Sequence, residues 1–301
     1  MWYVLAISFI ILIFLFICLE IAFSIVLPKT RTLERTKKME IDKDPTIFDF
    51  YETHLTKRSF IKSRYGYSLA LYYFLNYNSP KFVVIAHGHI HTHHGSLKYA
   101  KMMYDYGYNV ILYDQRYHGN SGGKNTTLGF YEKYDLYDII TKVFQEFGEG
   151  IYLGTYGESM GGATVLLEQE GDSRIRFTIS DCSFSSLDRL IQDQFRSYHL
   201  PKFMYFFVDW FVKIITGIKL EEVSPLKSIT HKNVPILFIH GEQDNLINHQ
   251  HTLDLYEACP DKKRLFIAKN NATHAFSFYS DNEEYKKIVK EFLEVDGYDN
   301  L

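Results

Sequence analysis

The first pattern along the chain is a long apolar run at its N-terminus. Residues 1–19 carry no charged side chain, and apart from Glu20 and Ser24 the run continues to Leu27, where Pro28 ends it. A helix rises about 1.5 Å per residue, so a run of this length can cross the ~30 Å hydrocarbon layer of a bilayer. The pattern predicts a transmembrane anchor over residues 1–28, with residues 1–27 in contact with the lipid bilayer.

Two other interpretations of this run fit less well. A secretory signal would carry basic residues before a shorter apolar stretch, and none precede this one, although Ala22-Phe23-Ser24 resembles a cleavage site. A buried core helix is seldom so long and so uniformly apolar at the start of a soluble domain. Five basic residues follow the run, namely Lys29, Arg31, Arg35, Lys37 and Lys38. By the positive-inside rule they place the remainder of a single-pass cell-membrane protein on the cytoplasmic side.

A charged segment at residues 29–46, expected to be a juxtamembrane linker, leads into a domain at residues 47–301 in which short apolar runs alternate with helical patterns. Residues 60–63 and 67–76 are expected to form an antiparallel hairpin around Tyr65-Gly66. The later apolar runs predict strands at residues 82–86, 109–113, 151–155, 175–180, 236–239 and 265–268. Helical patterns predict helices at residues 97–106, 131–147, 163–170 and 252–258. Continuous apolar strands separated by helices indicate a mostly parallel sheet covered on both faces, which is an α/β fold.

Two further helical segments have features of their own. A capping box of Ser280 with Glu283 predicts the start of a final helix. Residues 183–230 interrupt the rhythm of strands and helices, and we expect them to form a cap. Within the cap, residues 203–215 are apolar almost all round, which fits packing on the core, roofing an apolar pocket or touching the bilayer surface.

Composition excludes some classes of function. The 301 residues include 33 basic and 36 acidic side chains, and a net charge of −3 offers no basic field for nucleic acid. The three cysteines, Cys18, Cys182 and Cys259, lack the number or spacing of a disulfide framework or a zinc site. We interpret them as ordinary thiols.

A nucleophilic serine is predicted at residue 159. Gly157-Glu158-Ser159-Met160-Gly161 follows an apolar strand and runs directly into a helical pattern. A serine on such a strained strand-to-helix turn needs small neighbours. The same pattern of glycines surrounds Ser121, but a polar loop follows it rather than a helix.

A serine hydroxyl needs a histidine to take its proton and a carboxylate to orient the histidine ring. In an open parallel sheet such groups are expected in loops beyond the carboxyl ends of the strands. His274 follows the last predicted strand and Asp244 follows the strand before it. Asp181, at the end of the strand at residues 175–180, is the alternative acid.

Several motifs together resemble the α/β-hydrolase superfamily, especially its serine aminopeptidase-like, prolyl oligopeptidase-like and monoacylglycerol lipase-like members. The resemblance is carried by His87-Gly88, by residues 114–121, 157–161 and 240–244, and by His274-Ala275. The chain order Ser159, Asp244, His274 is the order of that superfamily. The resemblance implies a helical cap on the sheet and an oxyanion hole formed by the backbone N–H groups of His89 and Met160. It also implies that Asp114 and Arg116 buttress their loop, in which Tyr117 departs from the small residue of relatives.

A histidine-rich segment suggests a different enzyme. Residues 87–94 contain His87, His89, His91, His93 and His94 and look like the ligand motif of metallo-β-lactamase-like hydrolases. His93, however, stands where that motif has its aspartate. We therefore expect no catalytic metal, and we interpret the segment as a polar loop at the mouth of the pocket.

Together these features predict a membrane-anchored serine hydrolase that cleaves carboxylic esters, or amides and peptides, through an acyl-enzyme on Ser159. Its expected partners are a small ester, acyl or peptide substrate and the bilayer, with no nucleic acid and no cofactor. A serine peptidase, an acyltransferase and a non-catalytic scaffold of the same fold are the alternatives. The sequence leaves the oligomeric state open.

Overall fold

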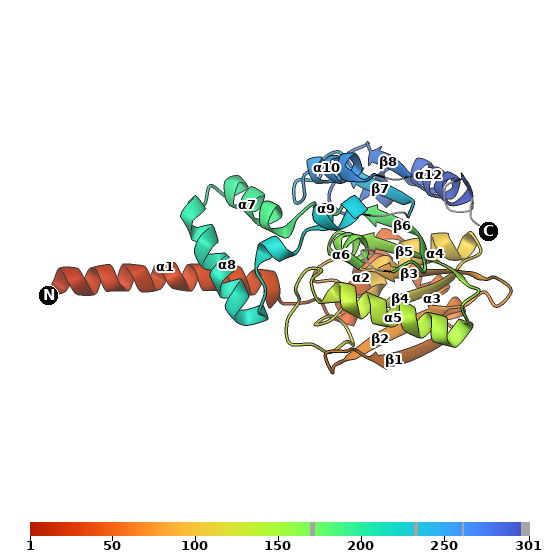
Figure 1. Cartoon of the computed structure of the whole chain (residues 1–301), viewed down its shortest axis with the longest axis horizontal. Coiled ribbons are helices and arrows are strands. Elements are labelled where there is room, and N and C mark those ends of the chain that lie inside the picture. Colours follow the sequence, from red (N-terminus) through yellow and green to blue (C-terminus); the bar gives the residue numbers. More distant parts are fainter. Residues whose placement is uncertain (169–171, 232–233, 261, 296–301) are drawn as a thin grey trace.

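Eight strands form one sheet in the computed structural model, which describes residues 1–168, 172–231, 234–260 and 262–295 (Figure 1). The strands are β1 (Lys57–Lys62), β2 (Ser68–Phe74), β3 (Lys81–Ala86), β4 (Asn109–Tyr113), β5 (Tyr152–Glu158), β6 (Ile175–Asp181), β7 (Ile236–Gly241) and β8 (Lys263–Ala268). Their order is β1-β2-β4-β3-β5-β6-β7-β8. β1 and β2 pair antiparallel, and β2 pairs antiparallel with β4, whereas β3 to β8 are parallel. The predicted hairpin and the predicted mostly parallel sheet are confirmed.

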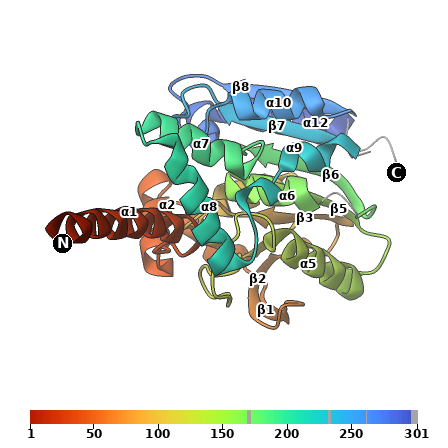
Figure 2. The same ribbon diagram turned by 60° about the vertical axis from the view of Figure 1, so that its left-hand side comes forward.

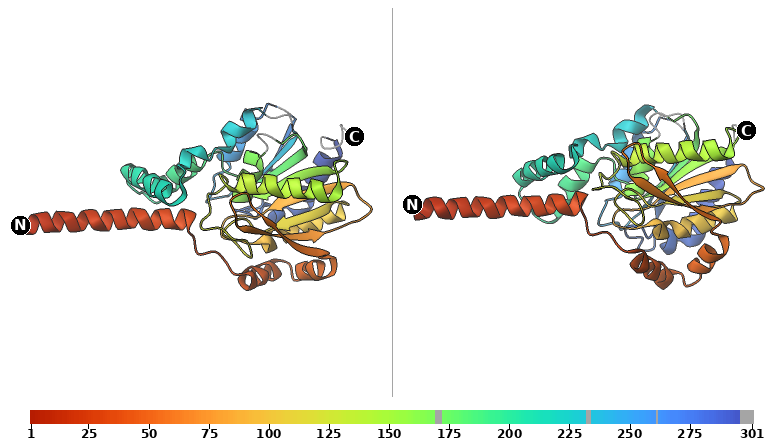
Figure 3. Two further views of the ribbon diagram at one scale, coloured as in Figure 1. Left: turned by 60° about the horizontal axis from the view of Figure 1, so that its bottom comes forward. Right: turned by 90° about the horizontal axis from the view of Figure 1, so that it is seen from below.

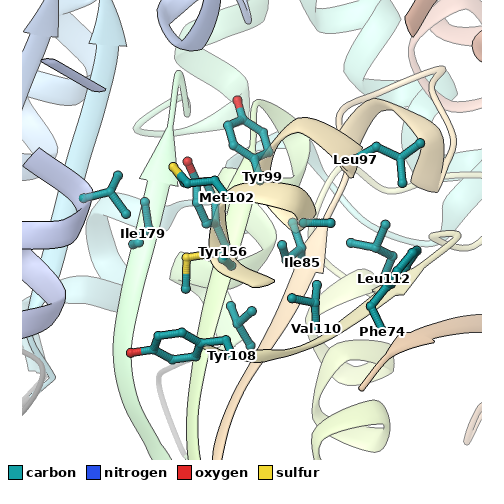
Figure 4. Close-up of a cluster of buried hydrophobic side chains, with 14 of the residues drawn as sticks. Phe74, Ile85, Leu97, Tyr99, Met102, Tyr108, Val110, Leu112, Tyr156 and Ile179 are labelled. Atoms are coloured by element: carbon teal, nitrogen blue, oxygen red, sulfur yellow. The ribbon is translucent and has the colours of Figure 1, made fainter. Parts of the chain in front are cut away.

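Helices cover both faces of the sheet, because strands β2 to β7 are buried on both sides. One face packs against α3 (Ile47–His54), α4 (Leu97–Asp105) and α12 (Asn282–Val295). Figure 4 shows part of this cluster, in which Tyr99 and Met102 of α4 lie over Ile85 and Tyr156 of the sheet. The other face packs against α5 (Glu132–Phe147), α6 (Met160–Glu168) and α10 (Gln250–Ala258).

The predicted start of the last helix is wrong. Ser280 ends a separate short helix, α11 (Ser277–Ser280), and its hydroxyl donates to the carbonyl oxygen of Ser277 at 3.4 Å. α12 begins only at Asn282. The predicted helix at residues 163–170 begins earlier, at Met160, and its last two residues lie outside the described part of the chain.

The segment expected to be a linker is structured. Residues 29–46 contain helix α2 (Leu33–Lys43), capped by the Thr32 hydroxyl, which accepts a hydrogen bond from the Arg35 backbone N–H at 3.2 Å. Thr36 and Glu40 of α2 are buried against the domain, although the helix is mostly charged. The charged sequence indicated a linker. It did not reveal α2 because this helix packs through polar side chains rather than through an apolar stripe.

The segment expected to be a cap is helical and leaves the sheet after β6. It contains α7 (Leu187–Ser197), α8 (Lys202–Thr216), two short 3-10 turns (Leu220–Glu222 and Ile229–His231) and α9 (Pro225–Ser228). Another 3-10 turn, His93–Ser96, precedes α4.

The N-terminal run forms α1 (Trp2–Val26), which projects from the domain and packs by its C-terminal half against the cap (Figures 2 and 3). Cys18, Ala22, Ile25 and Val26 are buried there among residues of α7 and α8. Most of the preceding residues are exposed. Within the part of the chain that the structure describes, α1 is the one helix long and apolar enough to cross a membrane.

Candidate active site

Ser159 lies on the sharp turn between β5 and α6. Its backbone has a φ of 57°, in the left-handed region that ordinary residues seldom adopt. A Cβ on Gly157 would lie 2.1 Å from the carbonyl oxygen of Gly161, and a Cβ on Gly161 would lie 2.1 Å from that of Ala86. Glycines are therefore required on both sides of the turn, which is the reason for the pattern seen in the sequence.

The structure brings Ser159 and His274 together with Asp244. The Ser159 Oγ lies 2.9 Å from His274 Nε2, and His274 Nδ1 lies 2.6 Å from Asp244 Oδ2. An ionised carboxylate only accepts hydrogen bonds, so Nδ1 carries the proton and Nε2 is left to accept one from the serine. The three residues form one hydrogen-bonded chain at the carboxyl edge of the sheet.

Asp244 is held as a carboxylate by several donors. Its Oδ1 accepts the backbone N–H groups of Leu246 and Ile247, both at 2.9 Å, and His240 Nε2 lies 3.1 Å from its Oδ2. Burial alone would raise the pKa of Asp244, but the hydrogen bonds from His240 and His274 outweigh it and hold the pKa well below its usual range. The aspartate is therefore charged at neutral pH and fixed in orientation.

Asp181, the alternative acid, has other partners. Its carboxylate accepts hydrogen bonds from the hydroxyls of Tyr99 at 3.0 Å and Tyr285 at 2.8 Å. Burial, together with the negative charge of Glu158, raises its pKa. The structure thus places Asp181 in a buried tyrosine cluster beneath the site, while Asp244 contacts the histidine.

A cavity of about 190 Å³ opens beside Ser159. His89 and Met160, the residues expected to supply the oxyanion hole, both line it. A Cβ on Gly88 would lie 3.5 Å from the Cβ of Ser159, so the backbone that precedes His89 runs close to the serine. The remaining lining residues are mostly apolar and come from α1, α7 and the loops, namely Ser24, Ile25, Leu128, Phe184, Leu190, Ile191, Gln194, Leu246 and Ile247.

The histidines of residues 87–94 are turned toward separate partners. His93 Nδ1 lies 2.9 Å from Asp114 Oδ1, His94 Nδ1 lies 3.2 Å from the carbonyl oxygen of Leu33, and His89 Nε2 lies 3.2 Å from that of Ile25. Burial lowers the pKa of His89 to about 4, so its ring is neutral at pH 7. Among the described residues, the cluster of three potential metal ligands is formed instead by Cys182, Asp244 and His274. Burial raises the pKa of the Cys182 thiol well above its usual value, which makes it a poor ligand.

Ser121 and Asp114 form hydrogen bonds that fix the loop after β4. The Ser121 hydroxyl accepts the backbone N–H of Ala70 at 2.9 Å and donates to the carbonyl oxygen of Asp114. The Asp114 carboxylate accepts the backbone N–H groups of His93 at 2.8 Å and Asn120 at 2.9 Å. Tyr117 adopts a φ of 68° in this loop.

The sequence interpretation missed a buried ion pair behind the serine. Lys98 of α4 pairs with Glu158, the residue before Ser159, and its ammonium group donates to the carbonyl oxygen of Ala275 at 3.2 Å. Lys98 therefore connects the chain next to the serine with the chain next to His274. A lysine in a helical pattern is normally assigned to solvent, so the sequence carried no signal for this contact.

The sheet order, the elbow at Ser159 and the covering helices define an α/β-hydrolase. The family model for serine aminopeptidase, S33, matches residues 78–231. The uncharacterized protein YqkD of Bacillus subtilis is 36% identical over 285 residues, which cover 92% of this chain and 93% of that protein. The chain therefore belongs to the serine aminopeptidase (S33) family and is a serine hydrolase of the α/β-hydrolase superfamily.

More distant similarities agree with this fold. The lysophosphatidylserine lipase ABHD12 of Macaca fascicularis is 24% identical over 235 residues, which cover 72% of this chain and 56% of the lipase. An esterase of Pyrococcus furiosus superposes with a TM-score of 0.66 at 24% identity, covering 82% of this chain and 94% of the esterase.

Proposed function

We propose that this chain is a membrane-anchored serine hydrolase that cleaves carboxylic esters through an acyl-enzyme on Ser159. The observation that carries the proposal is the hydrogen-bonded chain from the Ser159 Oγ through His274 to Asp244. A hydroxyl 2.9 Å from an imidazole nitrogen that can accept its proton is arranged for nucleophilic attack.

The reaction follows from this arrangement in two halves. His274 Nε2 takes the serine proton while the Ser159 Oγ bonds to the ester carbonyl carbon, and the same proton then passes to the departing alcohol. Asp244 stabilises the imidazolium that forms between these steps. A water molecule then attacks the acyl carbonyl carbon while His274 takes its proton. The bond between that carbon and the Ser159 Oγ breaks, the proton passes from His274 to the Oγ, and the carboxylic acid leaves.

The negative charge on the carbonyl oxygen needs fixed donors. We assign the backbone N–H groups of His89 and Met160 to this oxyanion hole, in agreement with their position around the cavity. Met160 is the first residue of α6, where a backbone N–H has no partner within the helix and the helix dipole favours negative charge.

The cavity favours an acyl group over a peptide N-terminus. An aminopeptidase needs a negative group to bind the substrate ammonium, and the described residues that line this cavity include no carboxylate. Apolar side chains such as Leu190 and Ile191 instead suit a hydrocarbon chain. The names of the lipase and the esterase similar to this chain point to ester substrates as well.

Retention of α1 as an anchor is supported by its contacts. A cleaved signal peptide would leave the cap without Cys18, Ala22, Ile25 and Val26, which are buried against it. We therefore propose a single-pass protein whose catalytic domain, by its basic juxtamembrane residues, faces the cytoplasm.

The test is hydrolysis of a soluble short-chain ester and of an aminoacyl amide by the full-length protein in detergent. We expect ester hydrolysis, reduced about 10³-fold or more in Ser159→Ala, because the nucleophile is lost. Ser121→Ala, at the second glycine-flanked serine, is the matched control and should stay within a few-fold of the unmodified rate.

Equal ester hydrolysis by Ser159→Ala and the unmodified protein would contradict the proposal. Faster cleavage of the aminoacyl amide would identify a peptidase instead. Transfer of the acyl group to an added alcohol in preference to water would identify an acyltransferase. A folded protein with none of these activities would favour the scaffold interpretation.

A further inference from the structure

One face of cap helix α8 is apolar and exposed. Phe203, Phe206, Trp210 and Ile214, spaced by three or four residues, are 61%, 69%, 49% and 61% exposed and form a stripe along the helix. The opposite face, which includes Met204, Val208 and Val212, is buried against α1 and α7. α8 is therefore apolar toward both the protein and its surroundings, which is unusual for a helix in water.

The N-terminal end of the stripe lies against α1. Phe14 of α1 stacks on Phe203 with ring centroids 5.4 Å apart and meets Phe207 edge-on at 5.2 Å. Phe14 lies about 9 Å along α1 from Glu20, at ~1.5 Å per residue, on the side of the uncharged N-terminus. The start of α8 therefore lies at the level where α1 enters hydrocarbon.

The orientation of α8 fits the plane of a membrane surface. It crosses α1 rather than running alongside it (Figures 1 and 2). Lys202 and Lys213 are exposed at its two ends, where their long side chains can extend to lipid headgroups. The side chain of Asp209 is turned inward and accepts the backbone N–H of Leu220 at 2.8 Å.

The cavity beside Ser159 is bordered by the same elements. Ser24 and Ile25 come from the end of α1, and Leu190, Ile191 and Gln194 come from α7, which connects to α8. His89 Nε2, in the same cavity, lies 3.2 Å from the carbonyl oxygen of Ile25. Helix α1 therefore forms part of the cavity wall in addition to being the proposed membrane anchor.

We propose that α8 inserts its apolar stripe into the membrane leaflet that α1 enters, and that an acyl ester dissolved in that leaflet reaches Ser159 past the end of α1. The stripe contacts the acyl-chain region of a lipid bilayer, because its apolar surface is continuous with that of the predicted membrane span. This inference rests on the proposed function and names the source of its substrate.

The position of α8 is tested by the fluorescence of Trp210. The chain has two tryptophans, so Trp2→Phe leaves Trp210 as the single reporter. The full-length Trp2→Phe protein is placed in phosphatidylcholine vesicles with or without bromine on the acyl chains. We expect blue-shifted emission that is quenched by the brominated lipid. Emission typical of water and equal in both vesicles would overturn the inference.

The rate of ester hydrolysis tests whether the substrate reaches Ser159 from the membrane. The Phe206→Gln/Ile214→Gln variant makes the stripe polar, and the control Phe60→Gln/Tyr77→Gln alters exposed apolar residues of the sheet and of a turn. Each protein is assayed in vesicles with a long-chain monoacylglycerol and with a soluble short-chain ester. We expect the stripe variant to lose about tenfold in turnover of the vesicle-bound ester while it retains turnover of the soluble ester. The control should retain both.

The outcomes separate this inference from the proposed function. Equal effects of the stripe variant on both esters, or no effect on either, would overturn the route from the membrane, while hydrolysis of the soluble ester would leave the proposed function intact. An unmodified protein that cleaves neither ester would contradict the proposed function, and the fluorescence of Trp210 would still decide where α8 lies.

Discussion

Two buried aspartates near the site have opposite environments. Asp244 accepts four hydrogen bonds, one of them from His274, whereas Asp181 lies beside the like charge of Glu158 and contacts tyrosine hydroxyls. The carboxylate that stabilises a histidine cation must itself be charged and in contact with it. Asp244 meets both requirements.

This assignment predicts different effects for two conservative substitutions. Asp244→Asn should lower kcat for a short-chain ester about 10³- to 10⁴-fold, because the amide no longer favours the productive tautomer of His274. Asp181→Asn, the matched control, should change kcat by less than about tenfold. Steady-state kinetics of the two variants provide the measurement, and the reverse ranking would move the acid role to Asp181.

A third aspartate makes the stability of the fold depend on pH. Asp135 of α5 accepts hydrogen bonds from the hydroxyls of Ser63 at 2.5 Å and Tyr67 at 2.7 Å, and burial raises its pKa to about 7. Between pH 4 and pH 7 the folded chain therefore holds a proton that the unfolded chain has released. Stability should decline as the pH rises through this range, by up to about 1.4 kcal/mol per pH unit.

Asp135→Asn should remove this contribution, so that its free energy of unfolding falls less steeply from pH 5 to pH 7 than that of the unmodified protein. Urea unfolding at several pH values gives both slopes. Asp138→Asn, at a partly buried aspartate of the same helix that pairs with Arg64, is the control and should leave the slope nearly unchanged. Parallel curves for Asp135→Asn and the unmodified protein would show that Asp135 is charged throughout.

At the level of secondary structure, α2 is a mostly charged helix that packs on the domain through the buried polar side chains of Thr36 and Glu40. Burial alone would raise the pKa of Glu40, but its hydrogen bond to His91 and the charges of Lys98 and Lys43 lower the pKa to about 2. Glu40 is thus a charged anchor for α2 on the domain. The ion pair with Lys43 measures 2.9 Å between Nζ and Oε1.

Glu40→Gln should lower the free energy of unfolding at pH 7 by about 1–3 kcal/mol, because a buried charge pair is broken. The loss should shrink as the pH falls below 4.5 toward 2, where Glu40 becomes protonated in the unfolded and then the folded chain. Glu34→Gln, on the exposed side of α2, should change stability by less than about 0.5 kcal/mol. Urea unfolding at pH 7 measures the stability of both variants. Equal midpoints for Glu40→Gln and the unmodified protein would show that Glu40 does not hold α2 on the domain.

These elements also show how far the sequence alone could predict the structure. The parallel strands could be predicted because each contains a short continuous apolar run, and the hairpin because two strand-like segments flank Tyr65-Gly66. Ser159 could be predicted because its turn leaves room only for glycines on either side. α2 was missed because it docks through Thr36 and Glu40, which carry no periodic apolar signal. The capping box at Ser280 failed because α11 and α12 are separate helices, a break that the local pattern does not show.

On the scale of the whole molecule, the N-terminal helix and the catalytic domain share one apolar cluster. α1 could be predicted from its length and hydropathy, but its contact with the cavity could not, because Ile25 and Ser159 are brought together only by the tertiary fold. A domain that begins near residue 30 would lack Ser24 and Ile25 from its cavity wall. Full-length protein is therefore the appropriate material for functional tests.

The proposed function requires that Ser159 is an activated nucleophile. Full-length protein in detergent is treated with a fluorophosphonate, and the modified residue is located by intact mass and peptide mapping, beside Ser159→Ala and Ser121→Ala. We expect one adduct on Ser159, retained in Ser121→Ala, lost in Ser159→Ala and unaffected by a chelator. Folded protein that forms no adduct, or forms it equally in Ser159→Ala, would show that Ser159 is not the activated nucleophile.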